Sequence, residues 1–235
     1  MIAKVRKLEF HFDEKSVLPL DVAVEQGRVS PEALRVIEAT AEGQRTWAMA
    51  DKNTFDIPPI RSLVKSYLAH SKVSIDVFAR NKRWATYTND LNPETAAEYH
   101  MDALEFLQML EANGVKADLL IFDPPYSLEQ CKRAYEAVDR TPTMRDTQVW
   151  NRWTEHKQII SRLIEPNGVV LSFGWNSCGI GMKYGFKIED ILLVCHGAGH
   201  NDTICTVERK VESSQNLLFH SAVDKDESLL NSPPV

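Results

Sequence analysis

The chain has 235 residues and a formal net charge of −6, with 43% hydrophobic and 26% charged residues. This composition is typical of a globular protein, and the length accommodates one α/β domain with a full core plus an appendage. No apolar stretch approaches membrane-spanning length and the N-terminus lacks an apolar signal-peptide core, so we expect a cytoplasmic protein.

The first 50 residues form a stretch of their own in which nothing looks catalytic. Apolar and polar residues alternate over 7–12, which predicts a half-buried strand. Ser30 followed by Pro31 is a good N-cap and first-turn pair, and predicts that a helix begins there. We therefore expect residues 1–50 to be an N-terminal appendage.

Residues 51–210 alternate between predicted strands and helices. In chain order they are a helix over 57–68, strands over 73–78, 84–88 and 119–122, a helix over 158–164, and strands over 169–173, 188–195 and 203–207. This alternation predicts an α/β fold with a mostly parallel, doubly wound sheet, and the last two strands predict a C-terminal antiparallel hairpin at its edge. From about residue 211 the composition shifts to Ser, Asn, Asp and Pro, which predicts a disordered tail over 211–235.

The most informative stretch is the apolar run at 119–122 followed by Asp123-Pro124-Pro125-Tyr126. Two prolines prevent both a continued sheet ladder and a helix, so Asp123 and Tyr126 must leave the strand at its carboxyl end. Open α/β sheets bind their ligands at that end. The alternative is an ordinary β-turn, in which Asp and Pro take the first two positions.

The residue types in this motif suit methyl transfer to an amino group. The exocyclic amine of a base is a poor nucleophile, because its lone pair is delocalised into the ring. A carboxylate at Asp123 and the backbone carbonyl of Pro124 can each accept one N–H of such an amine, and the ring of Tyr126 can stack on the base.

Positive charge is concentrated in one segment of this acidic chain. Residues 57–84 carry a charge of +5, which would let a local surface follow phosphates; a solvated helix face and loop is the alternative. The basic residues are Arg61, Lys65, Lys72, Arg80, Lys82 and Arg83.

Four residues near the C-terminus could suggest zinc, namely Cys195, His196, His200 and Cys205. Their spacing matches no standard zinc site, and both cysteines fall inside predicted strands. We expect no metal there, and we expect the hairpin to form one wall of the base pocket. The four cysteines of the chain form no C-x-x-C pair and are typical of reduced thiols.

Several stretches, read in order, resemble the adenine-N6 DNA methyltransferases that depend on S-adenosylmethionine (SAM), above all the small solitary enzymes of phages and prophages. The resemblance implies a Rossmann-like SAM-dependent methyltransferase domain over residues 51–210, with double-stranded DNA as partner. The matching stretches are 55–60 (FDIPPI), 74–81 (SIDVFARN), 88–93 (TNDLNP), 99–107 (YHMDALEFL), 123–126 (DPPY), 169–177 (VVLSFGWNS) and 201–210 (NDTICTVERK).

The same resemblance implies roles for two further acids. Asp90 would accept hydrogen bonds from the ribose hydroxyls of SAM, whereas the residues alone also allow an N-cap or Asx-turn acid before Asn92-Pro93. Asp102 would accept from the adenine amine of SAM in a turn after a short strand. A single amphipathic helix from Pro93 onward, with Asp102 on its solvated face, is the alternative.

Other cofactor contacts follow from the matching stretches, at Ile57, Pro58, Asp76, Phe78, Ala79, Leu91, Ala103 and Asp123. One of these stretches departs from the family pattern, because Asp76 to Lys82 has no glycine where many of these enzymes have a glycine-rich turn against the methionine part of SAM. Phe78 also suits a core position.

The resemblance also makes residues 127–157 a target-recognition insertion. Trp150, Arg152 and Trp153 combine stacking surfaces with a guanidinium that can read a base edge, although tryptophans three apart also suit one buried helix face. Three other functions stay open. They are methylation of an RNA base, methylation of a protein glutamine, which Asp123 disfavours because that related loop begins with Asn, and DNA binding without turnover.

Overall fold

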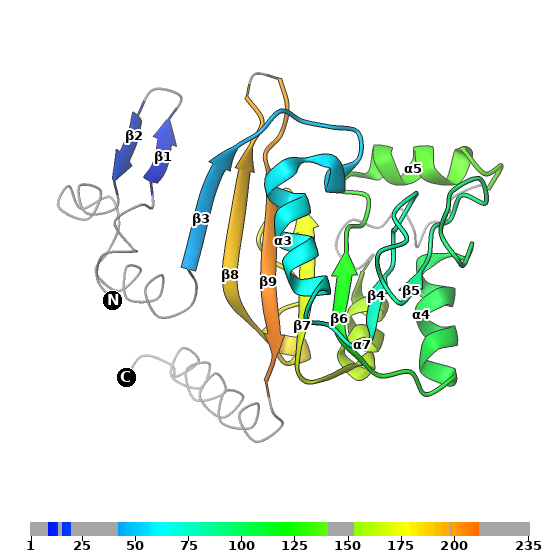
Figure 1. Ribbon diagram of the computed structural model, residues 1–235. Coiled ribbons are helices and arrows are strands. Elements are labelled where there is room, and N and C mark those ends of the chain that lie inside the picture. Colours follow the sequence, from blue (N-terminus) through cyan, green and yellow to red (C-terminus); the bar gives the residue numbers. More distant parts are fainter. Residues whose placement is uncertain (1–8, 14–15, 20–41, 141–152, 198, 212–235) are drawn as a thin grey trace, which may run out of the picture.

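The computed structural model describes residues 9–13, 16–19, 42–140, 153–197 and 199–211 (Figure 1). Strand β1 (Glu9–Asp13) pairs antiparallel with β2 (Ser16–Pro19), which confirms a strand near the N-terminus. The helix expected from residue 30 and the tail over 212–235 lie outside the described residues.

The described part of the chain contains one seven-stranded sheet, in the order β3-β8-β9-β7-β6-β4-β5. Only β9 runs against the others, since it pairs antiparallel with both β7 and β8, while the remaining neighbours are parallel. The mostly parallel α/β fold with a C-terminal antiparallel hairpin is therefore confirmed. The strands are β3 (Glu42–Trp47), β4 (Ser74–Asp76), β5 (Tyr87–Thr88), β6 (Ala117–Phe122), β7 (Ile164–Gly174), β8 (Phe186–Cys195) and β9 (Thr203–Lys210).

The hairpin is not at the edge of the sheet, contrary to expectation, because β3 pairs along β8 from Glu42 opposite Asp190 to Trp47 opposite Cys195. Figure 1 shows β3 as the outermost strand on that side. The last residues of the expected appendage, 42–47, thus belong to the main sheet. The six residues of β3, which include Gly43, show little alternation of apolar and polar side chains. The sequence therefore did not predict a strand there.

Helices cover both faces of the sheet, as a doubly wound fold requires (Figure 1). Helix α3 (Pro58–Leu68) packs Ile60 and Val64 into the core on one face. On the other face, α4 (Ala103–Ala112) and α7 (Thr154–Leu163) pack together. Helix α3 matches the expected helix almost residue for residue. Pro58 and Pro59 fit its first turn, because a backbone N–H there would have no partner within the helix.

Successive side chains of β6 point to opposite faces of the sheet, so the strand contributes to the hydrophobic core on each face. Leu119 and Ile121 pack on the α3 face, while Leu120 and Phe122 pack on the α4 and α7 face. All four side chains are at most 3% exposed. The continuous apolar sequence predicted a strand buried on both faces, and the structure confirms it.

The region between β5 and α4 is broken rather than helical, as the resemblance implied. Residue Asn89 forms an isolated bridge with Tyr99, and α4 begins only after Asp102. The Asp102 side chain caps α4 by accepting from the backbone N–H of Leu104 at 2.9 Å. A capping carboxylate satisfies one of the free N–H groups of the first turn, so the helix can begin there.

Two elements differ from the sequence expectations. The insertion contains a helix that was not expected, α5 (Leu128–Glu136), which is capped by Ser127 and buries only Cys131. Helix α7 begins at Thr154 rather than 158, and β7 begins at Ile164, so Pro166-Asn-Gly lies within the strand rather than in a turn that closes the helix. None of the helices in the described part of the chain is long and apolar enough to cross a membrane.

Candidate active site

Three carboxylates meet at the carboxyl edge of the sheet. Asp76 ends β4, Asp90 follows β5, and Asp123 follows β6. The pairing of β4 with both β5 and β6 is parallel, so all three strands end at the same edge. Beside it lies a cavity of about 1460 Å³, whose lining includes Asp90 and Asp123.

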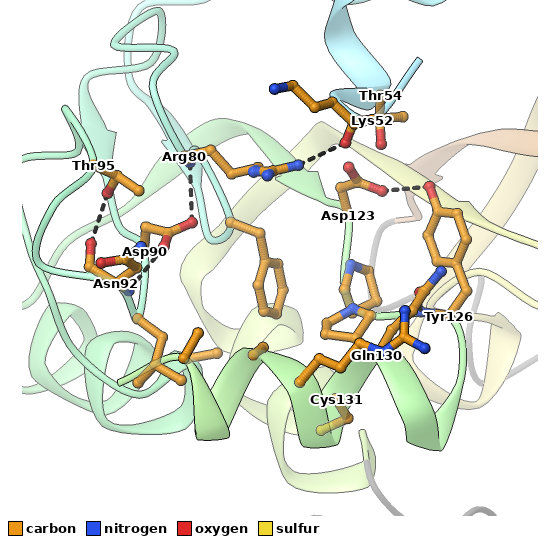
Figure 2. Close-up of a pocket in the computed structure, with 18 of the residues that line it drawn as sticks. Lys52, Thr54, Arg80, Asp90, Asn92, Thr95, Asp123, Tyr126, Gln130 and Cys131 are labelled. Atoms are coloured by element: carbon orange, nitrogen blue, oxygen red, sulfur yellow. Dashed lines mark hydrogen bonds between the residues drawn. The ribbon is translucent and has the colours of Figure 1, made fainter. Parts of the chain in front are cut away.

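Asp123 and Tyr126 are joined directly. The Tyr126 hydroxyl donates to Oδ1 of Asp123 at 2.5 Å, and the nearby Thr54 side chain lowers the pKa of both groups. Burial raises the pKa of Asp123 above its usual range, and the hydrogen bond from Tyr126 opposes that rise. The backbone N–H of Tyr126 donates to Oε1 of Gln130 at 2.7 Å, so α5 holds the end of the motif. Figure 2 shows Asp123 and Tyr126 pointing toward one another.

An aromatic corner lies beside the motif. The ring of Trp175, which follows β7, is T-shaped against Tyr126, with centroids 5.8 Å apart and planes at 68°. The Trp175 side chain is 42% exposed, which is unusual for a tryptophan, and it lines the same cavity as Pro124 and Pro125. A flat ring that enters the cavity would therefore meet two aromatic walls.

Asp90 organises the loops around the cavity. Its Oδ1 accepts from the backbone N–H of Asn92 at 2.9 Å, and its Oδ2 accepts from the backbone N–H of Arg80 at 3.1 Å (Figure 2). The Asx-turn alternative is thus present, yet Asp90 and Leu91 both line the cavity. Each carboxylate oxygen can accept a second hydrogen bond. Burial raises the pKa of Asp90.

Asp102 also has both a structural contact and a place in the cavity. Besides capping α4, it accepts from the Tyr135 hydroxyl of α5 through Oδ2 at 2.5 Å. Asp102 and Ala103 line the cavity together with residues of α5. Helix α5 therefore spans from the Asp102 end of the cavity to the Tyr126 end.

Not every expected cofactor contact lines this cavity. Asp76 is 1% exposed, lies in the sheet and lines neither cavity; its Oδ1 accepts from the Phe78 N–H, and Oδ2 has no hydrogen-bond partner among the described residues. Burial raises the pKa of Asp76 well above its usual range. Ile57 and Phe78 line the large cavity, Pro58 lines neither, and Ala79 lines only a second, smaller one.

Phe78 and Trp153 belong to one aromatic cluster. Phe78 contacts Phe122 and Trp153 edge-to-face, with centroids 5.6 and 5.9 Å apart, and Trp153 also contacts Phe122 and His156. Both Phe78 and Trp153 pack against the core and line the large cavity. Trp153 is thus partly buried at the N-cap of α7, while Trp150 and Arg152 lie outside the described residues.

The three basic residues expected to contact DNA have different surroundings. The Lys82 ammonium is ion-paired with Asp56 at 2.7 Å, and it lies over the Trp84 ring at 5.4 Å from the centroid. Arg83 is exposed and lines neither cavity. Arg80 lines both cavities, and its Nη1 donates to the Lys52 carbonyl at 2.7 Å.

The second cavity, of about 260 Å³, adjoins the first at Asp123. The 3-10 turn η2 (Thr54–Asp56) and the loop after β4 enclose it. The first cavity and the second share Thr54, Phe78, Arg80, Asn81 and Asp123.

No group of three or more His, Cys, Asp or Glu residues suited to a metal ion occurs in the described ranges. Both ring nitrogens of His196 are already bonded, Nδ1 with the Ala48 carbonyl and Nε2 with the Thr203 hydroxyl, each at 2.9 Å. Cys195 accepts from Nε of Arg45. The turn between β8 and β9 instead forms one wall of the large cavity, through residues such as His200 and Asn201.

Several cavity residues gave no signal in the sequence. Thr54 and Trp175 lie inside matching or adjacent stretches, but a lone Thr or Trp has no motif of its own. The α5 residues stand in a largely polar insertion and bury only Cys131, and neither the helix nor its contacts were foreseen. The cavity residues that were not expected include Thr54, Gln130, Cys131, Tyr135, His156, Trp175 and His196.

Comparison with known proteins gives a likeness of overall structure only. No family model matches the chain, and no curated protein matches it. Among solved structures, SMU.776 in complex with S-adenosylhomocysteine (SAH) is 10% identical with a TM-score of 0.43, over 63% of this chain and 49% of that one. The N-methyltransferase NodS of Bradyrhizobium japonicum with SAH is 9% identical with a TM-score of 0.45, over 81% and 98%.

TrmN from Thermus thermophilus is 13% identical with a TM-score of 0.42, over 66% of this chain and 49% of TrmN. The chain therefore spans about half the length of SMU.776 and TrmN. Identities and TM-scores this low assign neither a reaction nor a ligand to this chain.

Proposed function

We propose that this protein transfers a methyl group from SAM to the N6 amine of adenine in DNA. The observation that carries the proposal is the position of Asp123-Pro124-Pro125-Tyr126. This motif leaves β6 at the carboxyl edge of the sheet and faces the same cavity as Asp90 and Asp102. An acceptor pair for an amine and two acids suited to a nucleoside thus line one cavity.

The residues present fit SAM. Asp90, at the end of β5, has a lone pair left on each oxygen for the ribose hydroxyls. Asp102 keeps acceptor capacity for an adenine amine beside its bonds to Leu104 and Tyr135. When bound, SAM supplies a methyl group on a positively charged sulfur, which an amine nitrogen can attack.

Asp123 and Pro124 would prepare the target amine for that attack. The Asp123 carboxylate and the Pro124 carbonyl accept the two N–H groups and draw the nitrogen lone pair out of conjugation with the ring. Because burial disfavours a charge at Asp123, the Tyr126 and Thr54 hydroxyls support its ionised form. Tyr126 and Trp175 flank the base on two sides.

In this proposal the target base leaves the helix stack to reach the site. Asp123 lies at the strand end with Tyr126 packed beside it, and an amine inside duplex DNA could not reach it. Exposed Arg83, beside the cavity loops, is a candidate for contact with the phosphate backbone. Trp150 and Arg152 keep their expected role in sequence recognition as part of this proposal.

Incorporation of labelled methyl groups from SAM tests the proposal. Duplex DNA, RNA and a glutamine-containing protein are offered in parallel to the wild type and to Asp123→Ala. Label in the N6 position of adenine in DNA, lost in the variant, supports the proposal. Label confined to RNA or protein would overturn the DNA assignment, and SAM binding without transfer to any of the three would indicate a DNA-binding protein without turnover.

A further inference from the structure

Arg80 stands where the chain departs most from the family pattern. Its backbone φ is +50°, in the left-handed region that favours glycine, and it follows β4 in the turn that lacks glycines. The hydrogen bond from its N–H to Asp90 holds this turn in place. The turn therefore keeps a glycine-like backbone while it carries a cationic side chain.

Arg80 is an exposed residue, yet its guanidinium is held at the site by a hydrogen bond. Its Nη1 donates to the Lys52 carbonyl, and Figure 2 shows the guanidinium ending beside Asp123. Arg80 lines both the large and the small cavity, which adjoin at Asp123. A guanidinium has five N–H donors, so the contact with Lys52 leaves donors for a carboxylate.

The electrostatics of the site call for such a cation. Two acids that line the cavity, Asp90 and Asp123, lie beside the turn, and their carboxylates would repel any anionic group that entered. Lys82 in the small cavity is already ion-paired with Asp56. The side chain of Lys52 points away from Asp123 in Figure 2.

We propose that Arg80 binds the carboxylate of the amino-acid end of SAM, in the space where the two cavities adjoin. This inference rests on the proposed function, because it presumes SAM as the cofactor. It gives Arg80 a different role from the phosphate contact expected from sequence. It also accounts for the missing glycine. A glycine lets the backbone lie close to the methionine part of SAM, and here a charged hydrogen bond from Arg80 would hold that part instead.

Calorimetry with two ligands tests the assignment without turnover. SAH contains the amino-acid end, whereas 5′-methylthioadenosine has the same nucleoside and sulfur but lacks that end. The variant is Arg80→Gly, because glycine tolerates the positive φ and leaves the turn unstrained. Arg83→Ala is the control. It removes an equal charge three residues from Arg80, and the Arg83 side chain lies outside both cavities.

The expected result is that Arg80→Gly binds SAH about ten- to a hundredfold more weakly and binds 5′-methylthioadenosine as the wild type does. Arg83→Ala should bind both ligands normally. Unchanged SAH affinity in Arg80→Gly, or equal losses for both ligands in a variant whose melting temperature is unchanged, would overturn the inference. If the wild type binds neither ligand, the proposed function fails with it. Unchanged SAH affinity together with a flatter salt dependence of DNA binding would assign Arg80 to phosphate instead.

Discussion

The hydroxyl of Tyr126 lies 2.5 Å from Oδ1 of Asp123, so the last side chain of the motif supports the first. Two prolines between them force the tight turn that allows this contact. In the proposed reaction Tyr126 would therefore have two effects, a ring beside the target base and a hydroxyl that favours the ionised acceptor. These effects can be separated by substitution.

Asp123→Ala should abolish methyl transfer and leave SAH binding nearly intact. The substitution removes the acceptor for the amine, while Asp90 and Asp102 still hold the nucleoside. Turnover is measured with labelled SAM on duplex DNA, and SAH affinity by calorimetry. Near-wild-type turnover in this variant would show that Asp123 is a turn residue and no more.

Tyr126→Phe should keep much of the activity at high pH but lose it sooner as the pH falls. Burial raises the pKa of Asp123, and the Tyr126 hydroxyl lowers it in part. The acceptor must be ionised, so activity declines as the pH falls through this pKa. Without the hydroxyl the pKa rises further, and the acidic limb of the pH profile moves to higher pH.

The control for this pH profile is Tyr135→Phe, which removes a hydroxyl bonded to Asp102 rather than Asp123. Its acidic limb should match that of the wild type. An identical limb in Tyr126→Phe and wild type would mean that Asp123 does not set the pH dependence. Tyr126→Ala should lose activity at every pH, because base stacking is worth about 1 to 3 kcal/mol.

Asp90→Asn should weaken binding of both SAH and 5′-methylthioadenosine. A charged hydrogen bond to a ribose hydroxyl is worth about 1.5 to 3 kcal/mol, and an amide keeps only one acceptor oxygen. Exposed Glu98, outside both cavities, provides the control Glu98→Gln. Unchanged affinity in Asp90→Asn would reduce Asp90 to its contacts with Asn92 and Arg80.

The parts of the fold that could be predicted are those with strong local signals. The apolar run of β6, the proline entry of α3 and the alternation of strands and helices all depend on nearby residues. Helix α5 and strand β3 could not be predicted, since α5 buries a single residue and β3 is fixed by pairing with a strand almost 150 residues later. Tertiary contacts rather than propensity form such elements.

The candidate site was predictable to a similar degree. We expected Asp90, Asp102 and Asp123 at one ligand site, and all three line the large cavity, while their roles stay predictions. The sequence could not show which cation points inward. Arg80, Lys82 and Arg83 look alike in a basic segment. Only the structure shows that Arg80 lines both cavities, that Lys82 is ion-paired, and that Arg83 is exposed outside both cavities.

Gly179→Ala should destabilise the fold and loosen the loop after Trp175. Gly179 has φ +52°, and an added Cβ would collide with the carboxylate of Glu208. Glu208 is fully buried on β9 and accepts from Ser172 and from the N–H groups of Ile180 and Gly181. Backbone strain alone costs about 1 to 3 kcal/mol, and the steric collision adds to it. We therefore expect a larger loss than this in the free energy of unfolding measured with urea.

Gly114→Ala separates the two causes. Gly114 also has a positive φ, of +68°, but an added Cβ there meets nothing within 4 Å. Its substitution should therefore show strain alone, about 1 to 3 kcal/mol. Equal losses at the two glycines would argue against the collision with Glu208.

Arg83→Ala should weaken DNA binding on every sequence and reduce its salt dependence. A lysine or arginine that contacts one phosphate contributes about −0.9 to the slope of log affinity against log salt, because it releases condensed counterions. Arg83 is exposed, whereas the charge of Lys82 is partly neutralised by Asp56. Lys82→Ala should therefore change the slope less than Arg83→Ala does. By contrast, Arg152→Ala should alter sequence preference at one position, since a bidentate base contact is worth about 1 to 3 kcal/mol of discrimination.

The measurements for this last prediction are a salt titration of duplex binding for each variant and a map of methylated sites. Turnover at saturating DNA should change less than affinity in all three variants, because the motif at 123–126 is untouched. A slope in Arg83→Ala equal to that of the wild type would remove Arg83 from the DNA interface. A larger effect at Lys82 than at Arg83 would mean that its ion pair with Asp56 opens when DNA binds, and an unchanged site map for Arg152→Ala would place recognition elsewhere in residues 127–157.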